Sequence, residues 1–246
     1  MSLMSSLWGS VSGSVLGSVF GSHPQFSEAQ AARLAQWRAL PECDIRTPIT
    51  SSRYVVVDVE TSGLNVNKDR LIAIGAVALS HGKIALGDSL EIVLQQQRVS
   101  DKQNILIHGI GGTAQSEGVP PIDALLTFLE FVGRDPLVAF HVEFDETMIG
   151  RAMRQFLGFK MKQPWADLAY VAPALYPELA RSHRSLDQWM SFFGITNYAR
   201  HSALADAVAT AELLMALQPK LLAREATHFQ GLRDMERERR RLTHPI

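Results

Sequence analysis

A short apolar run that ends in two acidic residues constrains this chain more than any other feature. Tyr54 to Val57 are four consecutive β-favouring residues, typical of a strand buried on both faces of an α/β sheet. Asp58 and Glu60 follow, and because side chains alternate along a strand, both carboxylates point to the same side. Burying two acids there is costly unless a positive charge lies between them. The pattern indicates either a divalent metal site suited to Mg²⁺ or Mn²⁺, or a strand that ends in solvated acids.

Length and composition indicate one globular domain with extensions. The 246 residues are 46% hydrophobic and 20% charged, so the chain can bury a sizeable core. The net charge of −1 means that any contact with nucleic acid must depend on local basic patches. Cys43 is the only cysteine, which excludes an internal disulfide and suits a reducing compartment, so we expect a cytoplasmic protein. The sequence has no run of about eighteen strongly apolar residues, so no membrane span is expected.

Four segments are expected along the chain. Residues 1–24 are rich in glycine and serine and predict a disordered leader, although regularly spaced small residues also suit helix packing in a membrane. Residues 25–49 predict a helix, begun by Ser27, and a linker that packs on the domain. Residues 50–219 form the domain itself. Residues 220–246 predict a charged, arginine-rich helix, either solvated or in contact with nucleic acid or a partner.

Within the domain, strands come first and helices dominate the second half. Strands are expected at 54–57, 69–79, 83–94 and 137–140, the first three antiparallel. Helices are expected at 121–132, 143–157, 168–175, 185–193 and 203–217. Residues 105–112 predict a glycine-rich loop. This order of elements predicts a single α/β domain.

Three later residues can complete a site around the two acids. Asp145 stands where a buried strand passes into a helix, and Asp206 lies in the first turns of an alanine-rich helix capped by Ser202. His201 precedes Asp206 by five residues, a spacing that would turn it well away from Asp206 on one helix, so we expect it in the loop before the cap. Each residue also has a plain interpretation: helix-start acids that favour the helix dipole, and a surface histidine.

Together these residues form an ordered set: Asp-x-Glu on a first strand, Asp at a strand-to-helix junction, and His-x4-Asp at the start of a late helix. The set resembles the DEDDh family of 3′–5′ exonucleases, the DnaQ-like nucleases with a ribonuclease-H-like fold, over roughly residues 50–218. The resemblance implies an α/β mixed sheet flanked by helices. It also implies that Asp58, Glu60, Asp145 and Asp206 bind two Mg²⁺ (or Mn²⁺) ions and that His201 is the general base.

The resemblance extends to the surroundings of these residues. Thr61, Gly63 and Leu64 match the family's turn that holds the 3′ end of the substrate, and residues 107–110 resemble the loop before its first long helix. His141 departs from the family pattern, which has asparagine there. Four scattered basic residues and one acid complete the predictions: Arg151, Arg154, Lys160 and Lys162 as contacts to the nucleic-acid backbone, and Asp167 as a structural residue.

The activity implied by the resemblance is metal-dependent hydrolysis of single-stranded nucleic-acid ends to nucleoside 5′-monophosphates, with DNA favoured. An RNA-trimming exoribonuclease of the same family is the alternative. A non-catalytic nucleic-acid-binding module would be expected to lack an acid or the histidine, and all five residues are present. The expected partners are single-stranded DNA or RNA 3′ ends. A DNA polymerase is a further candidate, although the sequence shows no Gln/Pro-rich linker and so favours a free-standing protein.

Overall fold

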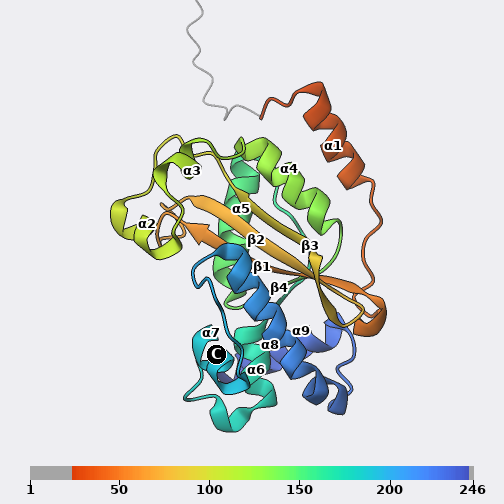
Figure 1. Ribbon diagram of the computed structural model, residues 1–246. Helices are drawn as coiled ribbons and strands as arrows, with labels where there is room; N and C mark the ends of the chain where they lie inside the picture. The colour runs from red at the N-terminus through yellow and green to blue at the C-terminus, as the bar shows by residue number, and fades with distance from the viewer. Residues whose placement is uncertain (1–23, 244–246) are drawn as a thin grey trace, which may run out of the picture.

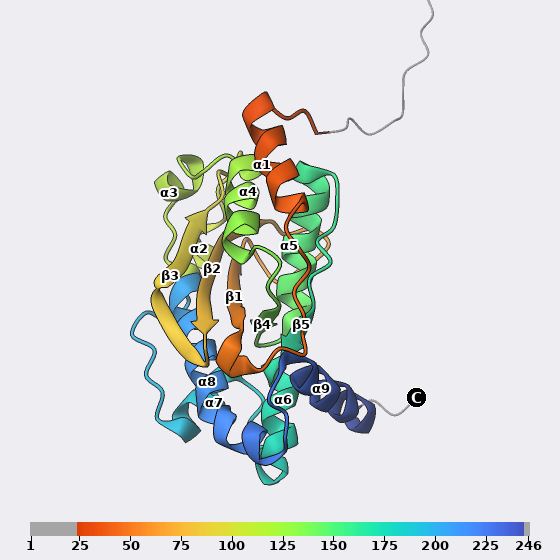
Figure 2. The same ribbon diagram turned by 90° about the vertical axis from the view of Figure 1, so that its right-hand side faces the viewer.

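The computed structural model describes residues 24–243, which form a five-stranded mixed sheet between two layers of helices (Figure 1). The strands are β1 (Arg53–Thr61), β2 (Leu71–Ser80), β3 (Lys83–Val93), β4 (Leu137–Ala139) and β5 (Trp165–Asp167). Their order across the sheet is β3-β2-β1-β4-β5, so that β1 is central, as Figure 2 shows. The pairs β1–β2 and β2–β3 are antiparallel, whereas β4 and β5 run parallel to β1 and β4 respectively. The predicted α/β fold and its antiparallel opening are confirmed.

One face of the sheet is covered by α4 (Pro121–Val132) and α5 (Val142–Leu157), and α1 (Glu28–Arg38) packs on α4 in the same layer of helices. Alternation along β1 turns Val55, Val57 and Val59 into this layer. The helix α1 begins at its predicted cap, because the Ser27 side chain accepts a hydrogen bond from the Gln30 backbone. It docks through the buried side chains of Leu34 and Trp37.

The other face is covered by α6 (Leu168–Leu175), α7 (Leu186–Phe193), α8 (Ala203–Ala223) and α9 (Phe229–Thr243), below the sheet in Figure 1. Tyr54 and Val56 point into this layer. Asp58 and Glu60 continue the same alternation beyond the apolar part of β1, so they face α8. Short 3₁₀ turns occupy Ile49–Ser51 and Pro177–Leu179.

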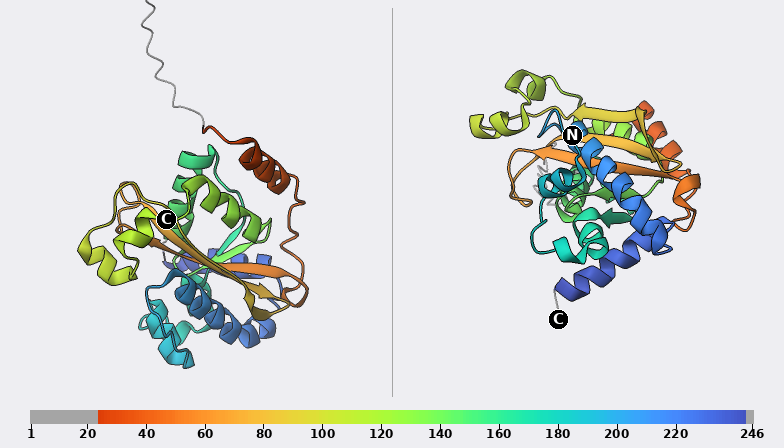
Figure 3. Two further views of the ribbon diagram at one scale, coloured as in Figure 1. Left: turned by 45° about the horizontal axis from the view of Figure 1, so that its top comes forward. Right: turned by 60° about the horizontal axis from the view of Figure 1, so that its bottom comes forward.

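One prediction about local structure is wrong in part, and one strand was missed. The predicted glycine-rich loop at residues 105–112 is limited to residues 109–111, because residues 105–108 lie in α2 (Lys102–His108) and Gly112 begins α3 (Gly112–Ser116). The Asp101 side chain caps α2 by accepting a hydrogen bond from the Asn104 backbone at 2.9 Å, and Gly109 ends it with a φ of 71°. Figure 3 shows these two short helices projecting past the edge of the sheet. The strand β5 was not predicted at all.

The C-terminal part also differs from the prediction. Helix α8 continues to Ala223 with Pro219 inside it, and the charged helix α9 begins only at Phe229. The helix is not simply solvated: Phe229 and Leu232 are buried against the domain, and α9 packs on α6 and β5. The predicted leader lies outside the described residues apart from its last position. No helix within residues 24–243 combines the length and the apolar character needed to span a membrane.

Candidate active site

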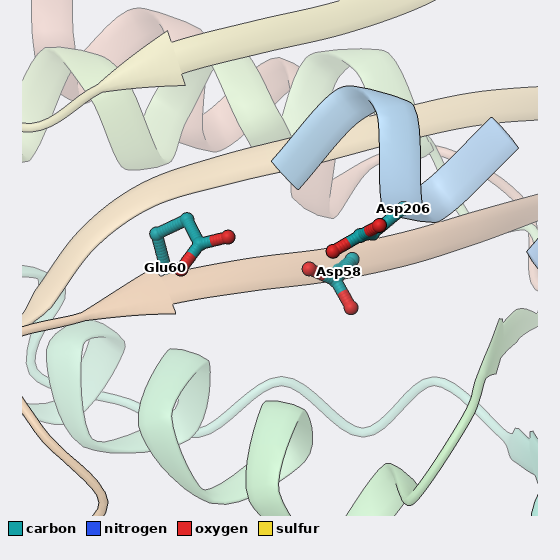
Figure 4. Close-up of side chains that lie close together, drawn as sticks. All are labelled: Asp58, Glu60 and Asp206. Carbon is teal, nitrogen blue, oxygen red and sulfur yellow. The ribbon is translucent and has the colours of Figure 1, made fainter. Parts of the chain in front are cut away.

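Three of the predicted acids meet at the end of the central strand. Asp58 and Glu60 come from β1 and Asp206 from the first turn of α8, and their carboxylates face one space in Figure 4. One carboxylate oxygen of each residue lies within 4.8 Å of one oxygen of the other two. The two-residue spacing in β1 therefore does place both acids on one side, as the strand alternation predicts.

A glycine in β2 allows α8 to come this close to the sheet. Gly75 lies opposite Asp58 in the β1–β2 register, and a Cβ added to it would lie 2.0 Å from the backbone carbon of Ala203 and 2.1 Å from the backbone nitrogen of Leu204. The N-terminal turn of α8 thus packs directly on the β2 backbone, which brings Asp206 to β1. Sequence reasoning missed this residue, although a glycine inside an apolar strand is a signal of close backbone approach.

We expect Gly75→Ala to pull the acid cluster apart. The new methyl group would overlap backbone atoms that cannot rotate away, so α8 must move, and overpacking of this kind costs about 1–3 kcal/mol or more. Thermal unfolding and Mn²⁺ calorimetry should show lower stability and weaker metal binding. Gly87→Ala in β3 is the matched control, because a Cβ there meets nothing within 4 Å and should change neither quantity. Wild-type metal affinity in Gly75→Ala would contradict this account.

Asp145 lies beside this cluster but is not one of the three acids that meet. It is buried in the first turn of α5. Burial raises the pKa of Asp145 well above its ordinary value, a hydrogen bond from the Val59 backbone opposes the shift, and repulsion from Glu60 adds to it. Repulsion also acts between Asp145 and Asp58. The structure therefore brings all four predicted acids to one end of β1, with Asp145 on the α5 side.

The electrostatics of the cluster fit a bound cation. Burial raises the pKa of Asp58 well above its usual range, and repulsion from Asp145, Asp206 and Glu60 adds to the shift. Burial and repulsion from Asp206 raise the pKa of Glu60 to about 8. Each of these carboxyl groups therefore loses its proton less readily than an isolated one, because neighbouring carboxylates repel the charge that forms. A divalent cation among their oxygens would relieve that repulsion. The donor set, carboxylate oxygens alone, is the set that Mg²⁺ and Mn²⁺ prefer.

One cation of the chain already contacts the cluster. The Arg200 guanidinium forms an ion pair with Asp206 and a second with Asp187, where Nε and Oδ1 are 2.7 Å apart. The amide of Asn197 donates to the other oxygen of Asp206. Neither Arg200 nor Asn197 was predicted. The position of Arg200, one residue before His201, was only a weak sequence signal for a role in the site. Its partner Asp206 becomes evident only when the path of the loop is known.

His201 occupies the predicted position in the loop before the Ser202 cap. Its backbone has a φ of 67°, in the left-handed region, and its amide donates to Oδ2 of Asp206 at 3.2 Å. The histidine side chain is exposed. Residue 201 is therefore tied to the acid cluster through its backbone, while its imidazole remains accessible from solvent.

The turn after β1 is braced by side-chain hydrogen bonds, several of which come from α5. The Thr61 hydroxyl donates to the Gly63 carbonyl at 2.7 Å, and the side chain of Leu64 is 88% exposed. Arg151 donates from α5 to the backbone carbonyls of Val66, Asn67 and Asp69. Arg151, which we expected to contact nucleic acid, therefore uses most of its hydrogen-bond donors to hold this turn.

Of the other predicted basic contacts, Lys160 pairs with Glu146 at 3.0 Å. Arg154 and Lys162 form no ion pair within residues 24–243. The four residues therefore do not share one role.

A buried network connects α9 to the helix that carries Asp145. Asp167 accepts hydrogen bonds from the backbone of His141 at 2.9 Å and of Ala169 at 3.0 Å, and Arg240 of α9 pairs with its other oxygen at 2.9 Å. His141 precedes α5 with a φ of 69°. Asp167 thus caps α6 and orients the start of α5, which agrees with the structural role predicted for it.

A ribonuclease-H-like mixed sheet with acids clustered at the end of its central strand defines the class: an α/β nuclease. A family model described as exonuclease, RNase_T, matches residues 55–214. The chain therefore belongs to this exonuclease family, which confirms the DnaQ-like resemblance.

The chain is similar to this domain in bacterial DNA polymerase III proteins. The chain is 37% identical over 166 residues to a DNA polymerase III PolC-type from Clostridium perfringens, an alignment that covers 65% of this chain and 11% of the relative. It is 29% identical over 178 residues to the DNA polymerase III subunit epsilon of Aquifex aeolicus, covering 72% of this chain and 86% of that protein. The chain thus spans only about a tenth of the PolC-type relatives' length.

Solved structures share the fold at low sequence identity. E. coli exonuclease I, in a complex with a dT13 oligonucleotide, superposes with a TM-score of 0.62 at 16% identity and covers 72% of this chain and 43% of that one. Exonuclease X, in a complex with 5′-overhanging duplex DNA, superposes with a TM-score of 0.57 at 20% identity and covers 74% of this chain and 99% of that one. At these identities the likeness establishes the fold.

Proposed function

We propose that the protein is a DEDDh-type 3′–5′ exonuclease that removes nucleoside 5′-monophosphates from single-stranded ends, DNA in preference to RNA. The observation that carries the proposal is the group of carboxylates from β1 and α8 within 4.8 Å of one another, with Asp145 beside them. Membership of the exonuclease family supports the reaction class. The preference for DNA draws on the oligonucleotide and overhang complexes of the two structural neighbours.

In this proposal Asp58, Glu60, Asp145 and Asp206 hold two Mg²⁺ or Mn²⁺ ions. Such ions supply an activated water and charge neutralisation at the phosphate when they are bound. The four carboxylates supply the negative charge that retains cations beside an already anionic substrate. A cation bound at Asp206 would compete with Arg200 and Asn197 for its carboxylate oxygens, and an Arg200 guanidinium released in this way could pair with a substrate phosphate.

His201 is the general base of the proposed reaction. Its side chain is exposed beside the cluster, and its backbone is fixed to Asp206, so the imidazole can swing over the site and accept the proton of the attacking water. The neutral form of an imidazole is the form that accepts a proton.

Thr61, Gly63 and Leu64 hold the 3′ end. The exposed Leu64 side chain offers an apolar surface for the last bases, and the Thr61 hydroxyl and Gly63 lie in the braced turn beside it. Contacts of this kind recognise the end and the backbone, so sequence preference is weak. The names of the polymerase III relatives make a DNA polymerase a candidate partner.

A blocked 3′ end tests this polarity. We expect a 3′-phosphate to stop degradation of a single strand, because it places extra bulk and charge where the turn at residues 61–64 receives a hydroxyl. A 5′-phosphate should have no such effect, and circular single strands should survive. Product lengths on denaturing gels give the readout. Cleavage of circles at the rate of linear strands would show an endonuclease and refute the proposed geometry.

A further inference from the structure

A cavity lies next to the turn that follows β1. It has a volume of about 600 Å³ and opens between the start of β2, the segment that leads from β3 towards α2, and the middle of α5. Arg151 lines it six residues after Asp145, which is about 9 Å along the helix axis. The cavity shares no lining residue with the acid cluster, and Asp69, in the turn that follows β1, borders it.

The walls of this cavity carry a surplus of positive charge. Arg70, Arg98 and Arg151 line it together with one acid, Asp69. Within residues 24–243 none of the three arginines pairs with a carboxylate. The Asp69 carboxylate is turned towards the turn instead, where it accepts hydrogen bonds from the Ser62 hydroxyl at 2.9 Å and from the Asn65 backbone at 2.8 Å.

Arg70 is positioned by the protein, and both Arg70 and Arg98 keep donors for a ligand. Arg70 donates from Nε to the Gln96 side chain at 3.2 Å and from Nη2 to the Arg98 carbonyl at 2.7 Å, and its Nη1 has no partner within residues 24–243. The Arg98 side chain is exposed and makes no hydrogen bond within the described residues. The cavity floor is apolar, formed by Leu71, Leu94, Met148 and Phe156. A basic rim above an apolar floor suits a nucleotide, with its phosphate at the arginines and its base below.

We propose that this cavity binds the phosphodiester backbone of the single strand several nucleotides upstream of the 3′ end. The proposal rests on the proposed function for the direction of the strand: a 3′ end at the acid cluster leads the chain over Leu64 and across the turn. Asp69 links the two sites, because it braces the turn with its carboxylate and borders the cavity. DNA and RNA share the chemistry that the arginines recognise, so both strands fit.

Binding without catalysis tests the cavity independently of the reaction. Fluorescence anisotropy in EDTA measures the affinity of 5′-labelled 3-mers and 12-mers, as DNA and as RNA. Arg98→Ala should weaken 12-mer binding about 2- to 5-fold, the worth of one exposed ion pair. It should also reduce the slope of log affinity against log salt by about 0.7, the value for one phosphate contact on a single strand. Gln155→Trp, which fills the cavity from α5, should weaken the 12-mer as well.

Two controls separate this effect from a general loss of charge or of fold. The 3-mer, which reaches only the acid cluster, should bind all variants equally. Arg46→Ala removes an exposed arginine that does not line the cavity and should leave 12-mer affinity and salt slope unchanged. Wild-type 12-mer affinity and slope in both Arg98→Ala and Gln155→Trp would overturn the proposal, as would equal wild-type affinity for 3-mer and 12-mer.

The outcomes also distinguish this site from the reaction. If the wild-type protein binds 12-mers through the cavity but hydrolyses no oligonucleotide, the proposed exonuclease activity is refuted and the proposed binding site is supported. If the wild-type protein degrades oligonucleotides but the variants bind 12-mers as the wild type does, the exonuclease activity is supported and the binding site is refuted. A twelve-residue polyglutamate peptide that binds where neither oligonucleotide does would assign the cavity to an acidic protein segment and overturn the nucleic-acid assignment.

Discussion

Asp58→Asn should abolish hydrolysis and at the same time stabilise the metal-free protein. The substitution removes a ligand charge at the end of the central strand without touching the apolar core, so we expect a loss of activity of roughly 10³-fold or more. Stability should rise because Asp58 is repelled by Asp145, Asp206 and Glu60. A loss of function joined to a gain of stability is the expected signature of a metal ligand set.

The pH dependence of this stability has a definite sign. Burial raises the pKa of Glu60 from 4.5 to about 8 in the folded protein. Between those values the folded state retains a proton that the unfolded state releases, so the contribution is present at low pH and is lost as pH rises towards 8. The raised pKa of Asp58 acts in the same direction. Metal-free wild-type protein should therefore melt at a lower temperature at pH 8 than at pH 5.

Thermal melts in EDTA across this pH range, compared with melts in Mn²⁺, check the prediction. Asp58→Asn should melt above the wild type in EDTA at pH 8 and gain less from Mn²⁺. Asp44→Asn is the matched control, an exposed acid in the segment between α1 and β1, and should change neither activity nor the pH profile. Retained activity in Asp58→Asn would refute the assignment of the ligand set.

His201→Ala should lower kcat by a factor on the order of 10²–10⁴, the usual worth of a positioned general base. The interaction that is lost exists mainly in the transition state, so binding of metal and oligonucleotide should change little. If the imidazole accepts the proton of the attacking water, the wild-type rate should rise with pH along a limb that the variant lacks.

Single-turnover rates against pH, with Mn²⁺ affinity from calorimetry, distinguish a base from a ligand. His183→Ala removes a partly buried histidine beside α7 and should keep the wild-type limb. If His201→Ala loses metal affinity and keeps its pH limb, His201 is a metal ligand and the mechanism proposed for it is wrong.

Much of the domain could be predicted because its signals are local. The apolar run before Asp58 predicts a buried strand, and the helices at 121–132 and 168–175 have the predicted bounds because apolar periodicity and a first-position proline or an Asp cap define them. The convergence of Asp58, Glu60 and Asp206 follows from strand alternation and from the order of the motif. The division into a domain and appended segments stays a prediction.

The remaining features depend on tertiary contacts that sequence patterns do not show. The strand β5 has three residues, too few for a period, and exists because β4 pairs with it. Gly75 matters only because α8 lies against it, and Arg200 matters only because its loop returns to Asp206. The high charge of α9 predicts a solvated helix and gives no sign of its buried face. One of its charged residues, Arg240, forms an ion pair with Asp167 in the domain.

The most direct measurement of the central claim follows a 5′-labelled single strand of DNA with wild-type protein in Mg²⁺ or Mn²⁺. Products resolved by length over time should form a ladder that shortens by one nucleotide at each step, with nucleoside 5′-monophosphates as the released species. EDTA should stop the reaction and excess metal should restore it. Immediate release of the labelled terminal nucleotide, internal fragments, or shortening that continues in EDTA would contradict a metal-dependent 3′–5′ exonuclease.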